Sequence, residues 1–125
     1  MKNIMNGLLV IMMLTLVSCS IGKKWVMTFE KNPYPNDPQS VKRGAEIYKR
    51  ECSGCHGVKG LGDGELGKDL TLKVTNLVEY AKINPVNNIA LHVKHGKFDT
   101  MPDFVKNLSH NDVWDVANYV KGLSK

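Results

Sequence analysis

The sequence predicts an all-α domain of three to four helices, because it contains clear helix starts and lacks alternating strand and helix patterns around residues 40–60. A capping side chain followed by proline, or by an acidic residue three positions later, is a typical start of an α-helix. Three such starts are present: Asp37–Pro38, Asn84–Pro85, and Ser109 with Asp112. Each precedes a segment with apolar residues at helical spacing.

The first 18 residues have the features of an export signal. Lys2 provides a positive start, and residues 4–17 are almost wholly apolar but shorter than the ~20 residues that a membrane-spanning helix needs. The run ends in Leu16-Val17-Ser18-Cys19, which resembles the lipobox of bacterial lipoproteins. This resemblance implies that Cys19 is lipidated and anchors the chain to a membrane. An ordinary secretory signal and an uncleaved anchor are the alternatives.

Residues 19–37 are predicted to be the lipidated cysteine and an extended tether. Pro33 and Pro35 disfavour a helix and hold the chain extended. The folded domain is then expected to cover residues 38–125.

The first helix of the domain is predicted to span residues 38–51. Val41, Ala45 and Tyr48 fall on one face of it. Gly44 costs about 1 kcal/mol relative to alanine inside a helix, so we expect another helix to approach closely there. A tolerated surface glycine is the alternative.

This helix leads directly into Cys52-Ser53-Gly54-Cys55-His56, a spacing typical of c-type haem attachment. The two thiols can add to the haem vinyl groups, and the imidazole of His56 can ligate the iron. A thioredoxin-like redox pair would need a βαβ context, which is missing. A zinc site formed by these cysteines with His92 and His95 would have spacings outside the usual range.

The segments after the motif alternate between loops and helices. Four glycines within residues 57–64 predict a loop, and the absence of a Lys followed by Ser or Thr excludes a phosphate-binding P-loop. Residues 66–80 are expected to be a loop with one short helix. The next helix is predicted to be capped by Asn84, with Pro85 in its first position, and to stop at Gly96.

The last helix begins at the Ser109 cap and carries an apolar stripe. The stripe consists of Val113, Val116, Ala117, Val120 and Leu123. Between the two final helices lies a loop, residues 97–102, that contains Met101.

Taken in order, these features resemble the single-haem class I c-type cytochromes over residues 38–123. The residues that carry the resemblance are Gly44 with Tyr48, Cys52 to His56, Met101-Pro102 and the aromatic final helix. The resemblance implies a small cytochrome c fold packed around one haem c attached to Cys52 and Cys55. It also implies that His56 and Met101 are the axial iron ligands.

The sixth ligand and the orientation of His56 leave alternatives open. Besides Met101, only Met27 in the tether lies outside the signal, so Met101 is the predicted sulfur ligand. His92, His95 or an open position are the alternatives. Many relatives also have a proline soon after the motif whose carbonyl orients the histidine. This chain has none there, and a carbonyl of the glycine-rich loop is one substitute.

Ligation by histidine and methionine implies a one-electron carrier rather than an enzyme. The predicted export signal and lipobox place this carrier in the periplasm or outside the cytoplasmic membrane. A haem-bearing subunit of a larger oxidase or dehydrogenase complex is the first alternative. A small haem enzyme or gas sensor with an open site is the second.

The chain is basic. Its formal charge of +5 favours acidic partners, anionic lipid or nucleic acid without choosing among them. Lysines that would border a haem edge could steer an acidic redox protein, although a merely soluble surface is the alternative. These lysines are Lys59, Lys68, Lys94, Lys97 and Lys106. No arginine-rich run is present, so we expect no nucleic-acid partner.

Overall fold

Helix α2 begins and ends where its sequence predicts. The computed structural model describes residues 30–97 and 100–125, and α2 spans Pro38–Glu51. The Asp37 side chain accepts a hydrogen bond from the Gln39 amide at 2.9 Å, and Pro38 fills the first turn. The predicted signal, the lipobox with Cys19 and most of the predicted tether lie outside the described residues.

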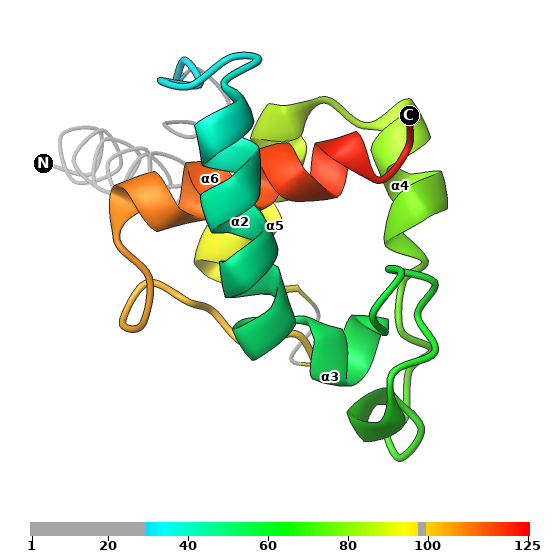
Figure 1. Cartoon of the computed structure of the whole chain (residues 1–125). Coiled ribbons are helices and arrows are strands. Elements are labelled where there is room, and N and C mark those ends of the chain that lie inside the picture. Colours follow the sequence, from blue (N-terminus) through cyan, green and yellow to red (C-terminus); the bar gives the residue numbers. More distant parts are fainter. Residues whose placement is uncertain (1–29, 98–99) are drawn as a thin grey trace, which may run out of the picture. The chain divides into compact units, whose positions relative to one another are not determined.

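Helix α2 crosses the last helix, α6, which spans His110–Gly122 (Figure 1). At the crossing, a Cβ on residue 44 would overlap the backbone carbonyl of Asp115. Only glycine allows the two backbones to come so close, and the close approach expected at Gly44 is confirmed. Nearby, the rings of Tyr48 and Tyr119 pack with their centroids 5.1 Å apart.

Helix α6 contributes more buried residues to the core than any other helix of the described chain. Its start is the predicted capping box: the Ser109 hydroxyl accepts from the Asp112 amide at 3.2 Å, and the Asp112 carboxylate accepts from the Ser109 amide at 2.9 Å. Its buried face comprises Val113, Trp114, Asp115, Val116, Ala117 and Val120. Leu123 lies just beyond its end, at the C-cap.

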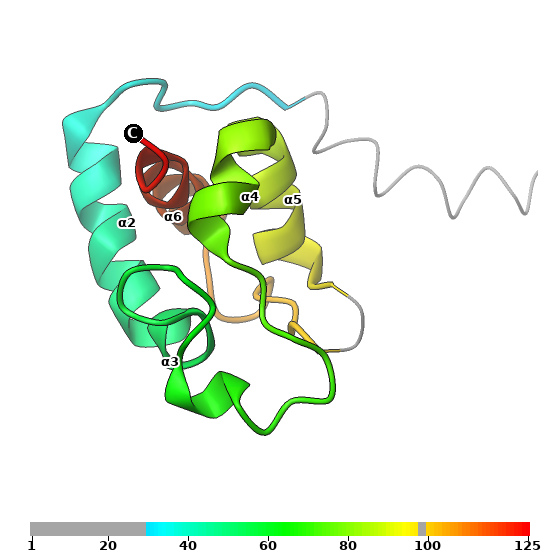
Figure 2. The same cartoon turned by 90° about the vertical axis from the view of Figure 1, so that its right-hand side faces the viewer.

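Four shorter elements lie between α2 and α6. They are α3 (Ser53–His56), the 3-10 turn η1 (Glu65–Gly67), α4 (Leu77–Ile83) and α5 (Val86–His95). Helices α4 and α5 both pack against α6, and α3 follows the end of α2 (Figure 2). The short helix expected within residues 66–80 is α4, which starts at the Asn76 cap and extends beyond Tyr80.

Helix α5 starts one residue later than predicted. Asn84 does not cap it, because Asn84 is the C-cap of α4 and its side chain donates to the Tyr80 carbonyl at 2.9 Å. Pro85 has an extended backbone and becomes the N-cap of α5, so the helix begins at Val86. The predicted stop at Gly96 is confirmed.

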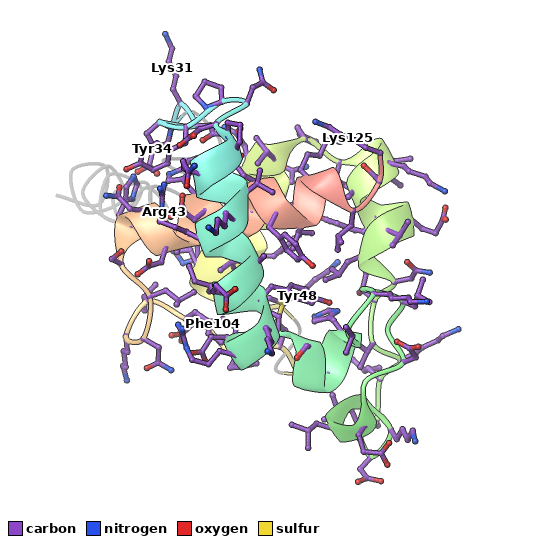
Figure 3. The ribbon with its side chains drawn as sticks, in the orientation of Figure 1. Lys31, Tyr34, Arg43, Tyr48, Phe104 and Lys125 are labelled. Atoms are coloured by element: carbon purple, nitrogen blue, oxygen red, sulfur yellow. The ribbon has the colours of Figure 1, made fainter. Side chains whose placement is uncertain are left out.

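The segment before α2 packs on α6. The Asn118 amide donates to the Tyr34 carbonyl at 3.2 Å and to the Ser40 hydroxyl at 2.9 Å, and it accepts from Asn32 at 2.6 Å. Arg43, in the N-terminal half of α2, lies over the Tyr34 ring with its guanidinium 5.4 Å from the ring centroid (Figure 3). The end of the predicted tether is therefore held against the helices.

The expected all-α class is confirmed in the described parts of the chain, where the only strand-like pairing is a bridge between Lys97 and Met101. Within residues 30–97 and 100–125, no helix has the length and hydrophobicity needed to cross a membrane.

Candidate haem site

Tyr48 holds the Cys-x-x-Cys-His turn at both of its ends. The Cys52 amide donates to the Tyr48 carbonyl at 2.9 Å as α2 ends, and α3 then carries the chain to His56. The buried Tyr48 hydroxyl donates to the Gly57 carbonyl at 2.7 Å, just after the motif. Burial raises the pKa of Tyr48, so the hydroxyl stays protonated and remains a donor.

Cys52, Cys55, His56 and Met101 line one cavity. Its outer part, which we call the loop lobe, is also lined by Leu70, Leu72 and Phe104. An adjoining core lobe reaches inward to Ile89, Val93, Val116 and Val120. Both lobes share Cys52, His56, Thr75, Lys97 and Met101. The two parts of the sequence that were predicted to meet at a haem therefore do meet.

The carbonyl of Thr75 orients His56. It lies 3.0 Å from Nδ1 of the ring, and because a carbonyl only accepts, the ring proton sits on Nδ1. Nε2 then has a free lone pair for a metal. Burial lowers the pKa of His56, and the hydrogen bond to Thr75 raises it by a smaller amount. The lowered pKa favours the neutral imidazole, which is the form that binds a metal.

The glycine-rich loop supports the motif in another way than expected. It does not contribute the carbonyl that orients His56. Instead its amides satisfy motif carbonyls: Gly62 donates to the His56 carbonyl at 2.8 Å and Gly64 to the Cys55 carbonyl at 3.1 Å. A Cβ on Gly64 would overlap the Gly54 carbonyl, so the loop can lie this close only with glycine there.

Met101 is placed by a short backbone bridge. Its amide and carbonyl both pair with Lys97 at 3.0 Å, directly after Gly96, the C-cap of α5. The Phe104 amide then donates to the Val93 carbonyl at 3.3 Å, and the Phe104 ring is buried. These contacts hold the Met101 side chain at the cavity, half-buried.

The two histidines considered as alternative ligands differ in position. His92 lies on α5 and lines the core lobe with His56 and Met101. His95 is exposed and lines neither lobe. Only His92 is near the predicted iron ligands, a distinction that spacing alone did not give.

The lining of the cavity suits a haem better than it suits a redox-active cysteine pair or a zinc site. Leu70 and Leu72 line the cavity and are 36% and 50% exposed. Such exposure is expected of apolar side chains that a bound flat apolar group would cover. Burial raises the pKa of Cys52 to about 12, unlike the lowered pKa of a redox-active thiol. Within the described residues, no three His, Cys, Asp or Glu side chains gather as a metal site, so the considered zinc cluster does not form.

Comparisons with known proteins identify the family of the chain. Residues 39–120 match the family model described as cytochrome c oxidase, cbb3-type, subunit III. Cytochrome c6 of Gracilaria tenuistipitata var. liui is 38% identical over 82 residues, which cover 66% of this chain and 71% of that protein. Cytochrome c550 of Pseudomonas aeruginosa is 26% identical, and the alignment covers 98% of this chain and 95% of the relative.

A solved structure has the same fold. It is a chain of the reducing HAO-like protein complex of Kuenenia stuttgartiensis, with a TM-score of 0.66 and 28% sequence identity. The similarity covers 74% of this chain and 47% of that one, so this protein spans about half of its structural neighbour.

Fold, cavity and relatives together define a class I c-type cytochrome, an electron-transfer protein with covalently attached haem c. Within this class, the chain belongs to the family described as cytochrome c oxidase, cbb3-type, subunit III.

Proposed function

We propose that this cytochrome is a one-electron carrier whose haem c is attached through Cys52 and Cys55, with His56 and Met101 as axial ligands. The observation that carries the proposal is the shared cavity, which brings these four side chains together from two distant segments. When bound, the haem supplies one-electron chemistry, and a histidine-methionine pair raises its reduction potential.

The surrounding residues have supporting roles in this proposal. The Thr75 carbonyl keeps Nε2 of His56 available, and Tyr48 fixes the turn that carries the cysteines. The apolar side chains of the core lobe would shield the inner part of a bound haem from water. With both axial positions filled, electron transfer needs no bond making or breaking, which suits a carrier.

We further propose that the chain is exported and tethered to a membrane by a lipid on Cys19. Support comes from the apolar run of residues 4–17 and the lipobox-like Leu16-Val17-Ser18-Cys19. The haem domain would then work in the periplasm or on the outer side of the cytoplasmic membrane. Its tether would let it reach redox proteins near that surface.

We expect acidic patches on those partners. Lys73 and Lys97 line the loop lobe, and Lys59 lies on the neighbouring glycine-rich loop. Such charges speed association with an acidic surface, and the rate falls as salt rises.

Optical spectra of the purified protein in both redox states test the proposed haem site. We expect low-spin spectra in both states and, in the oxidised state, a near-infrared band from sulfur ligation. A high-spin spectrum would refute ligation by Met101, and haem lost on denaturing electrophoresis would refute covalent attachment.

A second candidate function is a fixed subunit of a larger oxidase, suggested by the description of the matching family. The chemistry at the haem would be the same. Solubilisation of membranes in mild detergent distinguishes the two: a carrier elutes alone, whereas a subunit co-purifies with its complex.

A further inference from the structure

We propose that His92 is an alternative sixth ligand, which binds the iron of the oxidised haem when Met101 has been displaced or removed, while Met101 remains the ligand in the resting protein. The inference rests on the proposed function, in which His56 and Met101 hold the iron. It adds a second state, in which the same iron is held by His56 and His92.

The position of His92 is the first observation. Its side chain lines the core lobe together with His56 and Met101, between helix neighbours Ile89 and Val93, which are 4% and 6% exposed. The apolar wall that surrounds His92 would contact a haem in this cavity. The His92 imidazole therefore lies at the edge of the space that a haem would occupy beside Met101.

The contact with Tyr80 is the second observation. The His92 ring meets the Tyr80 ring edge-on, with centroids 5.8 Å apart and planes at 61°. Tyr80 also lines the core lobe, and the ammonium of Lys97 lies 5.3 Å from the centroid of its ring. The Tyr80 ring thus contacts the His92 ring at the wall of the core lobe.

The way Met101 is held is the third observation. The bridge between Lys97 and Met101 has two backbone hydrogen bonds, and Pro102 and Asp103 next to it are exposed. Opening this bridge breaks two backbone hydrogen bonds beside exposed residues, whereas His92 belongs to a helix packed on α6. Met101 can leave the cavity while His92 stays in place.

Ligand chemistry gives the direction of the exchange. A thioether is a soft donor that suits ferrous iron, and an imidazole is harder and gains relative to it on ferric iron. In the exchange, the bond from iron to Met101 sulfur breaks and a bond from iron to a His92 ring nitrogen forms. No electron moves in this step, because the redox partner has already oxidised the haem. The reduction potential of the histidine-histidine state is lower.

Variants of the full-length, haem-loaded protein test the proposal. Met101→Ala removes the sulfur ligand, and we expect its oxidised form to stay low-spin through His92, with the near-infrared sulfur band lost and the potential lowered. Met101→Ala/His92→Gln should become high-spin. The matched control is Met101→Ala/His95→Gln, which changes the exposed histidine one turn away and should stay low-spin. Far-ultraviolet circular dichroism checks that each variant keeps its helices.

Two results would overturn the role of His92. One is a high-spin Met101→Ala variant, and the other is a low-spin spectrum in both double variants, which would assign the site to another group. A failure of the proposed function looks different, because the unmodified protein itself would then lack the sulfur band.

Discussion

The hydroxyl of Tyr48 donates a hydrogen bond of 2.7 Å to the carbonyl of Gly57, and both groups are buried. Helix α2 and the turn that carries Cys52, Cys55 and His56 are tied together by this bond, because the Cys52 amide also pairs with the Tyr48 carbonyl. A residue in the helix thus fixes both ends of the haem-binding turn.

Tyr48→Phe should lower the free energy of unfolding by about 1–3 kcal/mol, because it leaves the buried Gly57 carbonyl without its partner. The ring and its packing on Tyr119 are kept. Denaturant unfolding of the haem-loaded protein measures the effect. Tyr119→Phe is the matched control, since no hydrogen bond from the Tyr119 hydroxyl occurs in the described parts of the chain. Equal losses in both variants would contradict the role of the Tyr48 hydroxyl.

Gly44→Ala should destabilise the protein by about 2 kcal/mol or more, although alanine is the better helix former. The new methyl group would overlap the Asp115 carbonyl and force α2 and α6 apart. Gly122→Ala is the control, because nothing lies within 4 Å of a Cβ at that position. Thermal unfolding should show a lower midpoint for the first variant and little change for the second. A neutral Gly44→Ala would mean that the crossing tolerates separation.

Local signals and long-range contacts explain what the sequence could predict. The starts of α2 and α6 were predictable because their capping groups lie within three residues of the backbone they bind. The role of the Thr75 carbonyl was not predictable from the sequence, because every residue has a backbone carbonyl. Only the path of the loop between residues 57 and 75 brings this one to His56. Asn84 carried a cap signal for α5, but α4 extended to Ile83 and used that residue at its own end.

Lys121→Met should destabilise α4, because the Lys121 ammonium donates to the Ala81 and Asn84 carbonyls at the end of that helix. Methionine keeps most of the apolar stem and loses these bonds, at a cost of about 1.5–3 kcal/mol. Hydrogen exchange of the α4 amides should accelerate more than that of α2. Lys125→Met, at the exposed end of the chain, is the control and should leave exchange unchanged. Uniform acceleration in α2 and α4 would argue against a local cap.

Cys52→Ala/Cys55→Ala should abolish covalent attachment of haem, because both proposed thioether positions are removed. Haem staining after denaturing electrophoresis measures this directly. The apolar cavity remains, so some haem should still bind before denaturation. Staining that persists in the double variant would place the attachment elsewhere.

Cys19→Ala should release the protein from membranes while leaving its haem intact. Two or three acyl chains are enough for stable anchoring, whereas the remaining apolar signal is too short to span a bilayer well. The measurement is the distribution of haem-stained protein between membrane and soluble fractions, together with labelling by radioactive palmitate. Ser20→Ala, next to the proposed lipid site, serves as the control and should remain membrane-bound and labelled. A Cys19→Ala protein that stays in the membrane fraction without label would favour an uncleaved anchor, whereas an unmodified protein that is soluble and unlabelled would favour an ordinary secretory signal.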